Sequence, residues 1–600
     1  MLTTLRAALA LVLLAGFYVF AAGLIAGMVL LGATLHSPKL FLFALIAAGG
    51  VLVAFWKVLR TKPELPSGFR VDEAQAPQLW AQVRDLAQRV GTRAPDEIQL
   101  VAEVNAAVVE DARWLGLVGG RRFLLLGTPL VQIFTVDQLR SVLAHELGHY
   151  SRSHTRLGAL SYRGRLTILH TLQRLDGLLA LVMSLYARLY FLVESAVSRR
   201  QEFEADVASA RIAGKGVATS ALREIPVLGN AWGFYLNSYV GWGLDSGYAP
   251  TNILAGFPRL WRERGEEIER MRRDPAPEER SRWDSHPPIT ARVAMIERQP
   301  EVVVQGDNRP ATELFVAFDS LLDSVERTEF EFGSRQLVPM AEFTRHAAQA
   351  NLQHSADRLY RAAGRITGVA SPGLRTVLEI VQSGRHAELV HSLGGLEIED
   401  LVKAGIGTAA VRSGAAHWEM SWTQVARLLD AHGEPFPVQE LAAPFAAGDP
   451  EGSRAALARL EALGVDPGEA RVVEATASAD RSEVVGAMIN MKVNGKRSDL
   501  IVLDTGIVIV PGMARLKMSR ARSRLAGLAE LPPAQLIAQP AYRYLPFEEM
   551  TRVVTHRRLR RTYEITMHGG AIVRIRHGGE SEDLGDTRAF VTALAPLLAR

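Results

Sequence analysis

His145-Glu146-Leu147-Gly148-His149 is the stretch that decides the fold of this 600-residue chain. The run before it, Thr135 to Ala144, predicts a helix, because its leucines and valines recur at helical spacing without proline or glycine. On that helix His145 and His149 lie one turn apart and face the same way. Two imidazoles so placed can bind one Zn²⁺, and Glu146 beside them can take a proton from a metal-bound water. The alternative is a solvated helix face that carries two histidines.

A second helical segment, Ser198 to Asp206, offers the further groups that such a site needs. A catalytic zinc requires a third protein ligand and an open position. Glu202 and Asp206 are four residues apart, so one helix face can present Glu202 to the metal and Asp206 to a ligand histidine. The second contact would fix the tautomer and the ring angle of that imidazole. Glu204 points elsewhere on this helix and is expected to be a solvated charge.

Two more motifs flank these segments: Asn105-Ala106-Ala107 upstream, and His286-Pro287-Pro288 with Arg292 beyond it downstream. In this order the four motifs resemble peptidase family M48, integral-membrane zinc metallopeptidases that include the HtpX heat-shock proteases and the CAAX-processing proteases. The resemblance covers residues 1 to about 300.

The resemblance implies a role for each motif residue. His145, His149 and Glu202 would bind zinc. Glu146 would be the general base, and Asp206 would support a ligand from behind. Asn105 and His286 would contact the substrate backbone or the tetrahedral oxyanion. The alternatives are a turn residue for Asn105 and a buried packing histidine for His286.

The amino terminus predicts a hairpin of two transmembrane helices. Ala7 to Leu35 and Leu40 to Trp56 carry no charged side chain, and a spanning helix needs about 20 apolar residues. Three basic residues follow the second stretch, so the positive-inside rule places the catalytic domain in the cytoplasm. We therefore expect an integral protein of the inner or plasma membrane that contacts membrane lipid. Leu166 to Val197 is too charged for two crossings and is expected to form long helices against the peptidase core or at the membrane surface.

The second half of the chain changes composition twice. From about Gly333 to Arg481, Ala, Leu and charged residues with Gly and Pro breaks predict several short helices. From about Val485 the pattern predicts strands, a turn at Asn494-Gly495 and a closing helix over Arg588 to Leu598. This layout resembles the pleckstrin-homology-like (PH-like) fold. Residues 486–600 hold 18 Lys and Arg against 10 Asp and Glu, which suits anionic lipid headgroups, a protein contact or a solubilising surface.

Composition excludes some functions. The chain has no cysteine, so no disulfide stabilises it and no thiolate serves as ligand or nucleophile. A formal net charge of +4 without a nucleic-acid motif gives no reason to expect a nucleic-acid partner.

The sequence as a whole predicts an α+β chain that is mainly α. It would comprise a transmembrane hairpin (1–62), a zincin-type metallopeptidase domain (63–330), a helical middle region (331–484) and a small β-rich PH-like domain (485–600). The predicted function is a membrane-anchored zinc endopeptidase that cleaves membrane or cytoplasmic proteins, in quality control or in the processing of one dedicated substrate. The alternative is a non-enzymatic membrane scaffold or lipid-binding sensor with an idle or structural zinc site. Three ligands and an intact Glu146 argue against it, because a structural zinc usually has four protein ligands.

Overall fold

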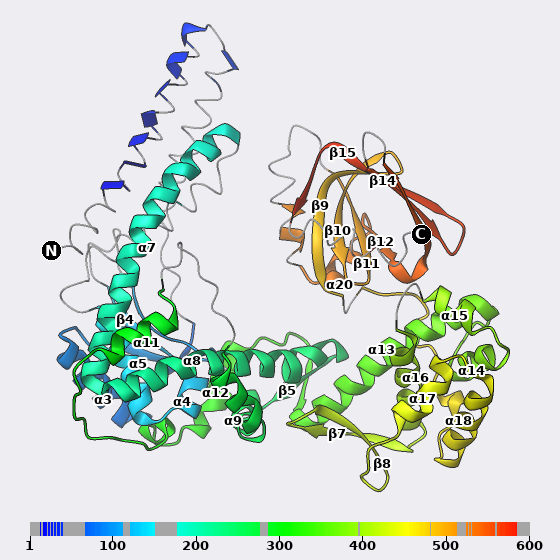
Figure 1. Cartoon of the computed structure of the whole chain (residues 1–600), viewed down its shortest axis with the longest axis horizontal. Helices are drawn as coiled ribbons and strands as arrows, with labels where there is room; N and C mark the ends of the chain where they lie inside the picture. Colours follow the sequence, from blue (N-terminus) through cyan, green and yellow to red (C-terminus); the bar gives the residue numbers. More distant parts are fainter. Residues whose placement is uncertain are drawn as a thin grey trace. The chain divides into compact units, whose positions relative to one another are not determined.

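Two compact units make up the chain: Met1–Asn237 with Asn252–Gly333, and Ser238–Thr251 with Ser334–Arg600. The computed structural model describes isolated positions between 12 and 42, then residues 67–111, 120–150, 168, 177–275, 286–393, 397–479, 482–512, 524–525, 527–529, 531–557, 561–584 and 594. Figure 1 shows the elements of each unit along the chain.

Among the residues just given there is no helix long and apolar enough to cross a membrane. This finding contradicts the predicted fold class, which begins with two transmembrane helices, and the predicted location in the inner or plasma membrane. Most of residues 1–62, where the hairpin was predicted, lie outside the described residues. The long helix α7 (Gly177–Ala213) carries Arg188 and Glu194 within its apolar part, and such charges are costly inside a bilayer.

A four-stranded sheet belongs to the first unit, and its strands follow the order β1-β2-β4-β3. The parallel pair of β2 and β4 is flanked by antiparallel neighbours on both sides. Strand β3 is therefore an edge of the described sheet. The four strands are β1 (Phe69–Val71), β2 (Glu97–Val101), β3 (Ala106–Glu110) and β4 (Arg122–Gly127).

Helix α5 (Val136–Gly148) lies at the centre of this unit, in contact with α3, α7, α8 and strand β3. Its apolar face is fully buried through Leu139, Leu143 and Leu147, as the helical spacing predicted. Further helices surround it: α3 (Pro77–Val90), α4 (Thr128–Ile133), α8 (Lys215–Tyr235), α9 (Ile253–Glu263), α10 (Gly265–Arg273), α11 (Ile289–Glu297) and α12 (Asp319–Glu329).

The second unit begins with a helical part, which the composition of the middle region predicted. Its apolar core is built around α13 and α16, with fully buried Tyr360 and Phe445 among its members. A parallel pair, β5 (Tyr248–Thr251) with β6 (Gln336–Pro339), and a hairpin, β7 (Ala416–Ser421) with β8 (Val425–Asp430), were not predicted. The helices are α13 (Met340–Thr367), α14 (Leu374–Gln382), α15 (His386–Ser392), α16 (Ile398–Arg412), α17 (Val438–Ala446) and α18 (Pro450–Ala462).

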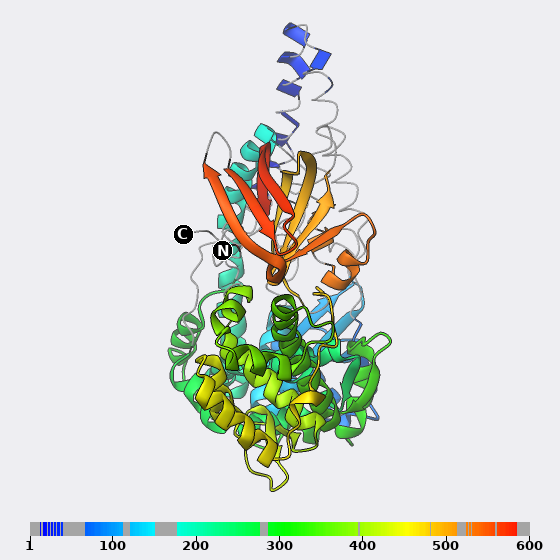
Figure 2. The ribbon, with the colours of Figure 1, turned by 90° about the vertical axis from the view of Figure 1, so that its right-hand side faces the viewer.

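The carboxy-terminal part of the second unit is a seven-stranded antiparallel sheet with the order β12-β11-β10-β9-β15-β14-β13. Its strands curve strongly in the side view of Figure 2. Buried side chains form two separate apolar clusters, which include Met491 in one and Ile489 in the other. The predicted closing helix lies outside the described residues except for Leu594, and the PH-like resemblance stays a prediction. The elements are β9 (Val484–Val493), β10 (Lys496–Leu503), β11 (Gly506–Pro511), α20 (Pro533–Ile537), β12 (Arg543–Pro546), β13 (Met550–Arg557), β14 (Arg561–Met567) and β15 (Ile572–Leu584).

Candidate metal centre

Helix α5 presents His145 and His149 from its last turn. The helix begins with a capping box, in which the Thr135 hydroxyl accepts from the Gln138 amide at 3.3 Å and the Gln138 side chain accepts from the Thr135 amide at 3.1 Å. The two imidazole rings lie 4.8 Å apart between centroids and are perpendicular to each other. The cap and the buried leucines therefore fix the helix that carries both rings.

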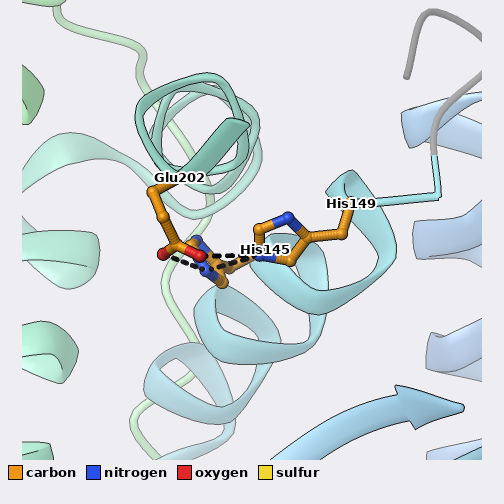
Figure 3. A group of neighbouring side chains, drawn as sticks. All are labelled: His145, His149 and Glu202. Carbon is orange, nitrogen blue, oxygen red and sulfur yellow. Dashed lines mark hydrogen bonds and ion pairs between the residues drawn. The ribbon is translucent and has the colours of Figure 1, made fainter. Parts of the chain in front are cut away.

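Helix α7 supplies the third side chain, Glu202, which points from α7 toward the two rings in Figure 3. The two helices approach closely where Gly148 faces Ala205, since a Cβ on Gly148 would lie 3.3 Å from the Ala205 Cα atom. Glu202 is buried, and its Oε2 atom makes no hydrogen bond, although Arg292 Nη1 lies 3.5 Å and His145 Nε2 3.6 Å from it. A metal ion at this position would give the buried carboxylate oxygen a direct partner.

The three candidate ligand side chains bring their metal-binding atoms close together. His145 Nε2 and His149 Nε2 are 3.2 Å apart; His145 Nε2 lies 3.6 Å from Glu202 Oε2, and His149 Nε2 lies 3.5 Å from the other carboxylate oxygen, Oε1. Zinc bonds of about 2.0–2.1 Å in a tetrahedron place neighbouring ligand atoms about 3.4 Å apart. The group His145, His149 and Glu202 is the one among the described residues whose geometry could hold a metal ion.

Asp206 lies one turn beyond Glu202 on α7 and contacts His145 from behind. Its Oδ1 atom is 3.1 Å from His145 Nδ1, which leaves Nε2 of that ring directed at His149 and Glu202. Asp206 also accepts two hydrogen bonds from Arg292, at 2.7 and 2.9 Å. Arg292 comes from α11, and its Nη1 atom lies 3.5 Å from Glu202 Oε2. The guanidinium thus holds both carboxylates of α7 in place.

His286 and Asn105 occupy different positions relative to this group. His286 Nδ1 is 3.0 Å from Glu202 Oε1, and 71% of its side chain is exposed, so it is not a buried packing histidine. Asn105 is exposed at the start of β3, where its backbone carbonyl accepts from the Gly127 amide at 2.7 Å. Within the described part of the chain, no hydrogen bond joins the Asn105 side chain to the three candidate ligands.

The pKa values of the two candidate ligand histidines are shifted in opposite directions. Burial opposes protonation of His145, but the carboxylates of Asp206 and Glu202 outweigh it and raise the pKa of His145 to about 9. Burial and the charge on His145 together lower the pKa of His149 to about 4. His149 is therefore a neutral donor near pH 7, whereas His145 must release a proton before it can bind a metal.

The carboxylates of the site are also divided. Burial raises the pKa of Glu146 to about 7, although the cations of His145 and Arg292 act in the opposite direction. Burial likewise opposes ionisation of Glu202, but its interactions with His145 and His286 outweigh burial and hold the pKa of Glu202 well below its usual range. Glu202 is thus an anionic donor near pH 7, while Glu146 can accept and release a proton there.

These features define a class of site: two histidines and a glutamate that could hold a metal ion, with the carboxyl of Glu146 beside them. The comparisons with known proteins agree, because residues 73–299 match peptidase family M48. The resemblance to family M48 stated from the sequence motifs is therefore confirmed for residues 73–299.

Curated relatives of this domain carry the name "Protease HtpX homolog". The protein from Thermococcus kodakarensis is 32% identical over 174 residues, which are 26% of this chain and 58% of that protein. The one from Methylibium petroleiphilum is 28% identical over 211 residues, 32% of this chain and 73% of that protein. A third, from Pseudarthrobacter chlorophenolicus, is 29% identical over 210 residues, 33% and 71% of the two chains. The chain thus spans less than two thirds of the Thermococcus protein, and no solved structure gives a significant match.

Sequence reasoning named the three side chains that the structure brings together but missed two contacts. Arg292 was noted as part of a motif without a role, and its two bonds to Asp206 were not foreseen. Tyr150, which follows His149 directly, donates from its hydroxyl to the Val108 carbonyl at 2.7 Å. Its place after the histidine was the one available signal. The lipid and protein partners predicted for the two ends of the chain have no support in the described residues or in the comparisons.

Proposed function

We propose that this chain is a zinc-dependent endopeptidase that cleaves extended segments of polypeptides. The observation that carries the proposal is the group of His145, His149 and Glu202, whose nitrogen–nitrogen and nitrogen–oxygen distances of 3.2 to 3.6 Å suit tetrahedral zinc. Three protein ligands leave a fourth position for water or substrate, and Glu146 stands beside them. A purely structural site would use four protein ligands.

The residues of the site would divide the chemistry between them. A bound zinc ion would supply a Lewis acid that polarises the scissile carbonyl and the attacking water. Glu146 takes the proton of that water and later delivers it to the leaving amine, a task suited to a carboxyl whose pKa is about 7. Asp206 keeps His145 in the tautomer that is protonated on Nδ1, so that the lone pair of Nε2 can bind the metal.

Two further residues would act on the substrate. The hydrogen bond between His286 and Glu202 raises the pKa of His286. This exposed imidazole can therefore donate a hydrogen bond to an oxyanion. Asn105 stands at the start of the edge strand β3, and an extended peptide can add to such an edge by main-chain hydrogen bonds. We assign Asn105 to contact with the substrate backbone there.

The test uses the purified full chain. Zinc removed with a chelator should abolish cleavage of an unfolded protein, and one equivalent of zinc per chain should restore it. Full cleavage by the metal-free protein, freed of other proteases, would contradict the proposal. The Glu146→Gln form should bind substrates without cutting them. The proteins that it traps in cells would then show whether the enzyme has one dedicated substrate or many.

A further inference from the structure

Strand β3 turns one row of backbone groups away from β4. The Asn105 carbonyl accepts from the Gly127 amide at 2.7 Å, and the Asp111 amide donates to the Arg121 carbonyl at 2.9 Å. In an antiparallel pair, residues that bond the partner strand alternate with residues whose N–H and C=O point outward. The outward groups of β3 therefore belong to Ala106, Val108 and Glu110.

One of these outward backbone groups already has a hydrogen-bond partner, Tyr150. Its hydroxyl donates to the Val108 carbonyl at 2.7 Å, which places this carbonyl on the side away from β4. Tyr150 is the residue after His149, so this contact lies next to the candidate metal ligands. A peptide that paired with β3 at Val108 would have to displace the tyrosine hydroxyl.

Two neighbours, Thr92 and Arg122, hold the tyrosine in this position. The Thr92 hydroxyl donates to the Tyr150 carbonyl at 2.6 Å. The Arg122 guanidinium lies 4.9 Å from the centre of the Tyr150 ring, and its Nη1 atom donates to the Thr92 hydroxyl at 2.9 Å. The Arg122 cation lies against the face of the Tyr150 ring, and the Tyr150 backbone is hydrogen-bonded to Thr92, which follows helix α3. The hydroxyl is thus a fixed donor rather than a freely rotating group.

On the basis of the peptidase function proposed above, we propose that Tyr150 is a specificity-determining residue that stops β-pairing of the substrate at Val108. An extended peptide adds to a sheet edge through main-chain hydrogen bonds, so its affinity grows with each backbone group that pairs. A substrate can form backbone hydrogen bonds with Ala106, but the tyrosine prevents them at Val108, the next residue whose backbone groups point outward. Substrate residues that would lie against Val108 and beyond therefore add nothing to the affinity.

The experiment measures how cleavage depends on substrate length. A cleavage site is first identified in an unfolded protein digested by the zinc-loaded full chain. Nested fluorogenic peptides then extend this site one residue at a time, separately on each side of the scissile bond. For the wild type, the fall in KM with length should stop early on one side. In Tyr150→Phe the longer peptides on that side should show a KM about 2- to 10-fold lower, the value of one hydrogen bond, with kcat unchanged.

Tyr235→Phe is the matched control, because it removes a tyrosine hydroxyl on α8 that also donates to a backbone carbonyl, that of Ile253 at 2.7 Å. Its length dependence should equal that of the wild type. The inference is overturned if the wild type shows no early stop, if Tyr150→Phe keeps the stop, or if Tyr235→Phe removes it equally. Peptide Kd values measured in the Glu146→Gln form should repeat the pattern without turnover. Absence of any zinc-dependent cleavage by the wild type would instead contradict the proposed function itself.

Discussion

Asp206 joins His145 to Arg292: its Oδ1 atom lies 3.1 Å from His145 Nδ1, while two hydrogen bonds of 2.7 and 2.9 Å reach it from the guanidinium. The side chain is 3% exposed, so these contacts are made away from bulk water. Because Glu202 stands one turn earlier on α7, the same helix provides one candidate ligand and orients another. The position of α7 relative to α5 therefore controls the whole donor group.

The first prediction concerns Asp206. Asp206→Asn keeps the shape of the side chain but removes the charge that orients His145. Zinc affinity or turnover should fall about 10- to 100-fold, the usual cost of losing such a supporting group. Glu204→Gln is the matched control, since Glu204 is on the same helix and pairs with Arg200, at 2.9 Å, instead of a ligand. Unchanged zinc affinity and turnover in Asp206→Asn would show that the carboxylate has only a structural role.

The second prediction concerns the pH dependence of metal binding. In the metal-free protein the pKa of His145 is about 9 and that of His149 about 4, so near pH 7 only His145 carries a proton. Zinc must displace that proton, and its apparent affinity should rise about tenfold per pH unit between pH 7 and 9, then level off above that.

Competition with a chelator at stepped pH values measures this slope, and calorimetry in buffers of different ionisation enthalpy counts the released proton. Asp206→Asn removes a carboxylate that raises the pKa of His145, so the plateau should begin at a lower pH in this variant. A pH-independent zinc affinity between pH 7 and 9 would contradict the proton assignment.

The third prediction separates metal binding from catalysis. Glu146→Gln should retain about one zinc per chain, because Glu146 is not among the three donors, and should lose about 10²- to 10⁴-fold in kcat as a general base is removed. Zinc content by atomic absorption and kcat on a cleaved peptide check both parts. Peptidase activity close to that of the wild type would rule out Glu146 as the base.

The helical period explains which parts of the site the sequence could predict. His145 with His149 and Glu202 with Asp206 are both spaced by four residues, and this spacing places each pair on one helix face. Arg292 is far from Asp206 in sequence, so their contact depends on how α11 packs and no local pattern contains it. The parallel pairing of β5 with β6 is of the same kind, because the two strands are separated by several helices.

The membrane prediction failed for a different reason. It was based on the absence of charge in two amino-terminal stretches, whereas a span requires a continuous helix that is both long and apolar. The structure shows no such helix within the ranges that it describes. Helix α7 has the length, but its second half holds the charged groups of the metal centre, including Glu202. The length of α7 alone therefore does not indicate whether this helix lies in a membrane.

The last prediction tests the close approach of the two helices that carry the donors. An alanine Cβ at position 148 would lie 3.3 Å from the Ala205 Cα atom and 3.4 Å from its Cβ, so α7 must shift by a few tenths of an ångström. Gly148→Ala should lower the free energy of unfolding by about 1–3 kcal/mol, as overpacking does. Bound zinc would hold both helices at one separation, so zinc affinity should also fall, about tenfold for each 1.4 kcal/mol of strain that the metal-bound form carries. Gly229→Ala in α8 is the control, because nothing lies within 4 Å of its added Cβ and the helix should gain up to about 1 kcal/mol. Denaturant unfolding and chelator competition measure the two effects, and a Gly148→Ala protein as stable and as tight for zinc as the wild type would mean that α5 and α7 can separate without moving the donors.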